Sequence, residues 1–169
     1  MTGSVLADAF GHHGWASIQT VDACLALDPA QLDSSVPGTY GSILDTLRHL
    51  LEADSSYLAV LSRGRIAPID ATGLSVRELR PIAAANAAAW SELVAGQIDP
   101  DELLVRHRPD GSESHAPAGV RLAQALHHGS DHRSQVCTAL TVLGFEPPAI
   151  DVWDYARGRA RLIEVPAPA

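Results

Sequence analysis

The chain has 169 residues, of which 46% are apolar and 19% charged, a length that fits one compact domain with its own hydrophobic core. With 12 basic and 20 acidic residues the formal net charge is −8, which argues against binding to a nucleic-acid backbone. All 12 basic residues are arginines, so chemistry that requires a lysine, such as Schiff-base formation or a P-loop, is excluded.

The N-terminal stretch from Met1 to Asp8 has no basic start and no continuous apolar run, so we expect no signal peptide. Apolar runs elsewhere in the chain are only a few residues long, too short to cross a membrane. The sequence therefore predicts a cytoplasmic protein with no membrane partner.

Apolar residues recur at intervals of three and four in four long segments, which predicts an all-α protein. The first helix is expected at about 5–27, with Trp15 and Ile18 on its apolar stripe, followed by a polar connector at 28–41. The second is expected at about 41–62, with Ser42 or Thr39 as its N-cap.

The third helix is expected at about 75–95, because Ser75 and Glu78 have the spacing of a capping box. Pro81 falls inside it, so a kink or a later start is expected. The segment from Asp101 to Pro117 has the pattern of a small β-hairpin. Two further segments, a fourth long helix at about 118–143 and a short helix at about 151–157, complete a single domain at 1–158 with a tail at 159–169.

Two of the eight histidines, His128 and His132, are four residues apart on the predicted fourth helix. On a helix they point about 40° apart, toward the side that also carries small apolar residues. Imidazoles on an apolar face need partners for their ring nitrogens, and a metal ion is one such partner. His49, on the predicted second helix, is the best candidate for a third ligand, although an exposed or boundary position is equally compatible with its place in the pattern.

These residues also carry a family resemblance. The chain resembles the DinB/YfiT-like family along nearly its whole length to about Gly158. The matching segments are the octapeptide around His49 (Leu47 to Asp54), the run His128 to Gln135, the opening His13-Gly-Trp15-Ala, and the closing Gly144-Phe-Glu-Pro-Pro with Asp151 to Ala156. Two departures are mild, since His13 replaces the family's usual Asn and Tyr57 stands where a Trp often follows the first ligand.

The resemblance implies a four-helix bundle of the DinB/YfiT-like type, with a β-hairpin between the third and fourth long helices and a short C-terminal helix. It further implies a homodimer and a site in which His49, His128 and His132 bind one divalent metal ion, most often zinc or nickel. Some relatives resemble S-transferases or isomerases that use a low-molecular-weight thiol such as mycothiol or bacillithiol. A hydrolase acting on a small-molecule substrate is also compatible with such a site.

Three further polar residues are candidates for the pocket or for the surroundings of the ligands: Gln135, Asn86 and His13. Gln135 lies about 60° from His132 and is placed to orient a ligand. Asn86 either lines the pocket or bonds a buried carbonyl, whereas His13 is expected mainly at the surface. Arg133 and Asp131 are expected in interhelical ion pairs. The sequence identifies no catalytic base.

Two other functions stay open at this point. One is a non-catalytic metal-binding or stress-response bundle that acts as a homodimer. The other is a purely structural bundle whose histidines pair with each other or with carboxylates. A site with an open coordination position favours an enzyme over both.

Overall fold

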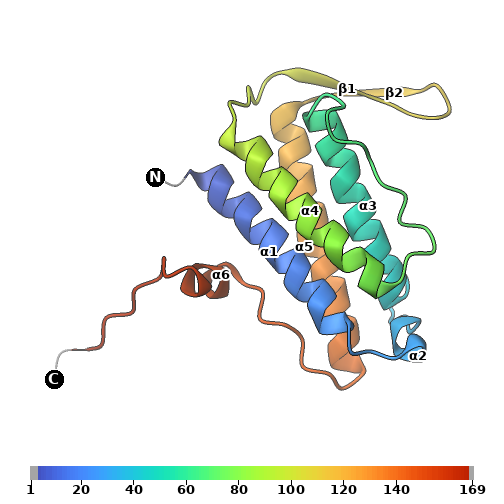
Figure 1. Ribbon diagram of the computed structural model, residues 1–169, viewed down its shortest axis with the longest axis vertical. Helices are drawn as coiled ribbons and strands as arrows, with labels where there is room; N and C mark the ends of the chain where they lie inside the picture. Colours follow the sequence, from blue (N-terminus) through green and yellow to red (C-terminus); the bar gives the residue numbers. More distant parts are fainter. Residues whose placement is uncertain (1–3, 168–169) are drawn as a thin grey trace.

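Four long helices and a small antiparallel hairpin make up most of the computed structural model, which describes residues 4–167 (Figure 1). The four long helices of the bundle, and the hairpin strands, are α1 (Val5–Cys24), α3 (Ile43–Leu61), α4 (Val76–Ala95), α5 (Ala118–Val142), β1 (Leu103–His107) and β2 (Glu113–Pro117). The predicted DinB-like bundle with a hairpin between its third and fourth long helices is therefore confirmed.

The local signals at the helix starts act as expected. The Ser42 side chain caps α3, and Ser75 forms a capping box with Glu78 at the start of α4. Helix α4 begins at Val76 and continues through Pro81, so the alternative of a later start is wrong. Pro81 is the sixth residue of α4, so the helix lacks the one backbone hydrogen bond that an amide at this position would donate to the carbonyl of Arg77.

Two short helices flank the bundle. Helix α2 (Pro29–Leu32) lies in the segment expected as a plain connector, and a capping box between Asp28 and Gln31 starts it. The C-terminal helix α6 (Val152–Gly158) was expected, and its Tyr155 packs against Trp15 of α1, with ring centroids 5.7 Å apart. Residues 1–3 and 168–169 of the predicted domain and tail lie outside the described residues.

The helices pack in a ring in which α1 and α3 each contact both α4 and α5. Figure 1 shows that the segment joining α3 to α4 runs back along the bundle, so these two helices point the same way. Helices α3 and α5 run in opposite directions and pack side by side (Figure 1). None of the helices within residues 4–167 is long and apolar enough to cross a membrane.

Helix α1 buries only part of the apolar stripe expected for it. Val21 of that stripe is fully buried, whereas Trp15 and Ile18 are only partly buried. His13 and Ser17 are buried as well, so the buried face of α1 includes polar residues. On this face Gly14 lies so close to α4 that an added Cβ would be 2.6 Å from the Cβ of Ala87, and such a close approach requires small side chains.

Buried polar side chains divide the hydrophobic core into two clusters. One cluster lies toward α2 and includes Leu47 and Val136; the other lies toward the hairpin and includes Leu58 and Trp90. Between the two, at similar heights on the four long helices, lie His13, Ser17, Asp54, Ser55, Asn86, His132 and Arg133, all of them buried. Because buried polar groups are costly unless they are hydrogen-bonded, this layer is the first place to look for function.

Candidate metal centre

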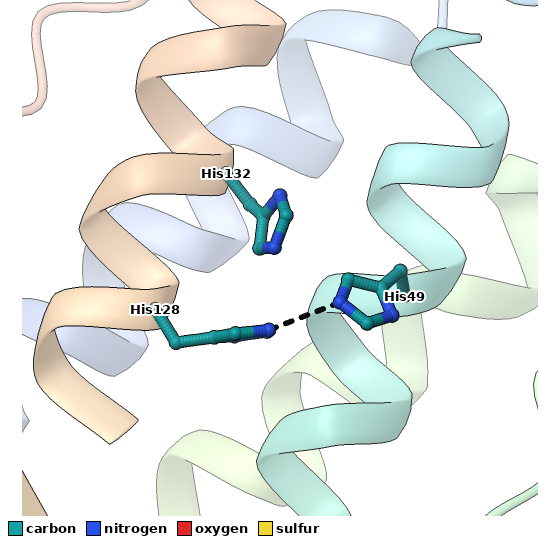
Figure 2. Close-up of side chains that lie close together, drawn as sticks. All are labelled: His49, His128 and His132. Carbon is teal, nitrogen blue, oxygen red and sulfur yellow. Dashed lines mark hydrogen bonds between the residues drawn. The ribbon is translucent and has the colours of Figure 1, made fainter. Parts of the chain in front are cut away.

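The three histidines that the sequence singles out come together between α3 and α5. His49 projects from α3, and His128 and His132 project from successive turns of α5 (Figure 2). Residues four apart on a helix lie on one face, so both α5 rings point at the same stretch of α3. Their candidate ligand atoms all lie within 4.8 Å of one another, a cluster that could hold a metal ion.

The spacing of the ring nitrogens is close to that of a coordination site. The Nε2 atoms of His49 and His128 are 3.0 Å apart, joined by a hydrogen bond (Figure 2). In a tetrahedral zinc site with bonds of 2.0 to 2.1 Å, ligand nitrogens are about 3.3 Å apart. The ring of His132 packs edge-on against both others, with centroid distances of 4.7 Å to His49 and 4.4 Å to His128. The three rings thus lie close enough together to be candidate ligands of a single ion.

The environment keeps two of these rings neutral. Burial, followed by the neighbouring His132 and His49, lowers the pKa of His128 from 6.5 to about 4. Burial and His132 also lower the pKa of His49. Metal ions bind the neutral imidazole, so protons compete weakly with a metal at these positions near pH 7.

Gln135 fixes the tautomer of His132. Its Oε1 atom accepts hydrogen bonds from the backbone N–H of Tyr40, at 3.1 Å, and from Nδ1 of His132, at 2.9 Å. The backbone N–H can only donate, which identifies the amide atom as the oxygen. Nδ1 of His132 therefore carries the proton, and its Nε2 lone pair is free for an ion.

A pocket opens beside His49. The ring of Tyr40 stacks on the ring of His49 with a centroid distance of 4.0 Å and an interplanar angle of 10°. Tyr40 and His49 line a depression of about 420 Å³ together with Asp45, Arg48, Glu52, Thr72 and two glycines. Of the three clustered histidines, His49 lines this depression, so a small molecule can approach the cluster from the side of His49.

The other predicted residues have different surroundings. The side-chain Nδ2 of Asn86 donates a hydrogen bond to the backbone carbonyl of Leu51 at 3.0 Å. Of the two roles expected for Asn86, the structure therefore shows the hydrogen bond to a buried carbonyl. His13 is fully buried, so its expected surface position is wrong. His13 lies about 160° from Trp15 around α1, on a buried face that the predicted stripe shares only in part, through Val21.

Arg133 is buried rather than part of a surface ion pair. Its Nη1 atom donates to Nδ1 of His13 at 3.2 Å and to Oγ of Ser17 at 3.1 Å. Asp131, two residues before Arg133 on α5, is exposed. The interhelical ion pair expected for Arg133 is thus replaced by hydrogen bonds to neutral groups of α1.

Sequence reasoning missed Asp54. This carboxylate is 1% exposed, and both its oxygens lie 3.0 Å from Nε2 of His13. A signal for the close packing here was Gly129, because a Cβ at this position would lie 2.3 Å from Cε1 of His13. A glycine next to a candidate ligand in the middle of a helix indicates that another side chain comes close.

A scan against protein-family models matches the DinB family over residues 1–164. A comparison with curated proteins finds no match. The family match covers all four long helices, the hairpin and each of the three clustered histidines. This chain belongs to the DinB family.

Proposed function

We propose that this protein is a divalent-metal-dependent enzyme in which His49, His128 and His132 hold one ion, zinc or nickel. The observation that carries the proposal is the cluster itself, three imidazoles whose ligand atoms lie within 4.8 Å of one another. The neutral state of His49 and His128 and the fixed tautomer of His132 support it, because all three then offer lone pairs at pH 7.

The ligand set also supports a catalytic role over a storage role. Three neutral protein ligands leave at least one coordination position of a divalent ion open. They also leave the positive charge of the ion uncompensated, and this charge lowers the pKa of a thiol or water bound to it. The depression lined by His49 offers a small molecule an approach to the cluster from that side. A sequestering protein would instead close the site with further protein groups.

The pocket supports a small, polar substrate. Arg48 and the carboxylates of Asp45 and Glu52 line it, so charges of both signs surround the entrance. Tyr40 covers one face of His49 with its ring, and 56% of Tyr40 is exposed, which leaves a flat surface for a ligand. We propose a thiol S-transferase that uses a mycothiol-like or bacillithiol-like cosubstrate as the first reaction to test and hydrolysis as the second; a homodimer remains part of the proposal.

The decisive experiment is elemental analysis of protein purified without a histidine tag. The natural chain, His49→Ala and His128→Ala are compared with His127→Ala, a matched control because His127 is exposed on the same turn of α5. We expect about one divalent ion per chain in the natural protein and in the control, and none in the other two variants. Unchanged metal content in His128→Ala, or no metal in the natural protein even after titration, would overturn the proposal.

If the metal is present, turnover is tested with mycothiol, bacillithiol or cysteine and a small electrophile such as 1-chloro-2,4-dinitrobenzene. Metal-dependent thioether formation that is lost in His49→Ala supports the transferase. Metal binding without turnover of thiols or esters would favour the non-catalytic metal-binding bundle.

A further inference from the structure

A buried carboxylate lies beside the histidine cluster and has no place in the proposed function so far. Asp54 of α3 is 1% exposed, and both its oxygens contact a single nitrogen, Nε2 of His13. A carboxylate offers about four acceptor positions, so one donor leaves most of its capacity unused. Burying a carboxylate with so few partners is costly unless it has a further role.

The hydrogen bonds around His13 determine which of its two ring nitrogens carries the proton. The guanidinium of Arg133 has no acceptor, so Nδ1 of His13, at 3.2 Å from its Nη1, must be the unprotonated nitrogen. Nε2 of His13 then carries the proton and donates it to Asp54. A cation, a neutral imidazole and a carboxylate thus form one buried chain across α5, α1 and α3, whose two charges compensate.

One ring nitrogen of the histidine cluster lacks a partner. Nδ1 of His128 is buried and has no hydrogen bond within residues 4–167, because the ring directs its Nε2 at His49. A histidine that binds a metal through Nε2 carries a proton on Nδ1 and nearly always donates it to a carboxylate, a carbonyl or water. His128 therefore needs an acceptor that the present contacts do not supply.

Asp54 is placed to be that acceptor. The ring of His128 lies between His49 and Tyr57 of α3, with centroid distances of 4.9 Å and 5.8 Å, and Asp54 belongs to this same stretch of α3. The imidazole of His13, bonded to Asp54, packs directly on Gly129, the residue that follows His128. The charge of Asp54 also acts on His128, favouring its protonated form.

We propose that Asp54 is a positioning residue for the metal centre, which accepts the Nδ1–H of His128 when His128 binds an ion through Nε2. Arg133 and His13 hold the carboxylate in place for this contact. The inference rests on the proposed metal site and adds a residue that neither the histidine motif nor the family match identifies. Such an acceptor fixes the orientation of the ring and raises its basicity, and its loss typically weakens metal binding by about 10- to 100-fold.

The test compares zinc affinity, measured by competition with a chromophoric chelator, for the natural protein, Asp54→Asn and Asp131→Asn. The control Asp131→Asn removes a carboxylate of the same charge from an exposed position of α5, next to His132. We expect Asp54→Asn to weaken zinc binding about 10- to 100-fold and Asp131→Asn to weaken it by less than about 3-fold. Equal weakening in the two variants, or no weakening in Asp54→Asn, would overturn the inference.

A second measurement needs no variant. In the zinc-loaded natural protein, labelled with ¹⁵N at histidine, we expect the Nδ1 of His128 to carry a proton that exchanges slowly with water. A proton that exchanges as fast as that of exposed His127 would overturn the role of Asp54 alone. Failure of the natural protein to bind zinc would overturn the proposed metal site as well, so the two failures are distinguishable.

Discussion

The Nε2 atoms of His49 and His128 lie 3.0 Å apart across the gap between α3 and α5, although 79 residues separate them along the chain. A hydrogen bond needs one donor and one acceptor, so at least the accepting ring of this pair is neutral. Protonation of both rings would place two donors and two positive charges face to face. The contact therefore links the protonation of the pair to the packing of the two helices.

Acidification is expected to destabilise the metal-free protein through His128. Its pKa is about 4 in the folded protein against an ordinary value of 6.5. Between these values the unfolded chain binds a proton here and the folded chain does not, so the free energy of unfolding falls as the pH decreases from about 6.5 toward 4. Above pH 6.5 this group has no effect. Urea unfolding at about pH 7.5 and pH 5 measures the difference.

The variant His128→Gln cannot titrate in this range and is expected to lose less stability between the two pH values. His127→Gln, changed at the neighbouring exposed position, is expected to follow the natural protein. If the free energy of unfolding of His128→Gln depends on pH as strongly as that of the natural protein, His128 is not the group responsible. The comparison between variants separates His128 from His12, whose pKa burial also lowers.

Gln135 is expected to strengthen metal binding by orienting His132. Gln135→Ala removes the acceptor of the Nδ1–H of His132, so zinc affinity should fall about 10- to 100-fold. Gln135→Glu keeps an oxygen acceptor and adds a charge, so it should retain or raise the affinity. Chelator competition measures both variants, with Ser134→Ala as an exposed control. The same affinity in Gln135→Ala and the natural protein would show that the tautomer is set elsewhere.

The fold and the shared face of His128 and His132 were predictable because they follow from regular patterns, whereas the pattern left the role of His49 open and the family resemblance supplied it. Apolar spacing and the capping signals at Ser42 and Ser75 located the long helices, and the spacing of His128 and His132 placed both rings on one face of α5. Helix α2 was missed, although the Asp28 and Gln31 capping box with Pro29 was readable in the sequence. Its four residues are too few to show a hydrophobic period.

The buried polar layer was not predictable from such patterns. Periodicity assigns polar residues to the surface, so His13, Asp54 and Arg133 had no signal that set them apart from solvated side chains. Their burial depends on one another, because each forms a hydrogen bond to a residue on another helix. A single segment of sequence does not contain that information, and only the packing of α1, α3 and α5 brings it together.

Arg121 is expected to hold the hairpin against the bundle. Its Nη2 atom donates to the carbonyls of Leu104 in β1 and Ser114 in β2, at 3.0 Å and 2.8 Å. Arg121→Met keeps much of the apolar stem and removes both bonds, so the hairpin amides should exchange hydrogen faster, while those in the middle of α3 change little. Hydrogen exchange followed by mass spectrometry measures this.

The control for Arg121 is Arg108→Ala, because Arg108 is exposed near the hairpin turn and bonds only the nearby Ser112 side chain. Exposed contacts of this kind contribute little to stability. Exchange in residues 103–117 that is equally fast in both variants would show that the strands hold their place without Arg121.

Gly129→Ala is expected to destabilise the protein by disturbing the buried polar layer. The new Cβ would lie 2.3 Å from Cε1 of His13 and 2.8 Å from Nη1 of Arg133. The imidazole cannot move aside cheaply, because Asp54 and Arg133 hold its two nitrogens. We expect a loss of about 1–3 kcal/mol in the free energy of unfolding, although alanine alone favours a helix by about 1 kcal/mol over glycine.

Urea unfolding measures this loss, with Gly158→Ala as the control, since no atom lies within 4 Å of a Cβ added at Gly158. The double variant with His13→Ala removes the ring that the methyl group strikes. If contact with the His13 ring causes the loss, Gly129→Ala should lower the free energy of unfolding less in the His13→Ala background than in the natural protein. Without the ring, the steric penalty is smaller and the helix preference of alanine offsets more of it. A cost of Gly129→Ala that is independent of His13 would instead assign the effect to the backbone of α5 and separate Gly129 from the polar layer.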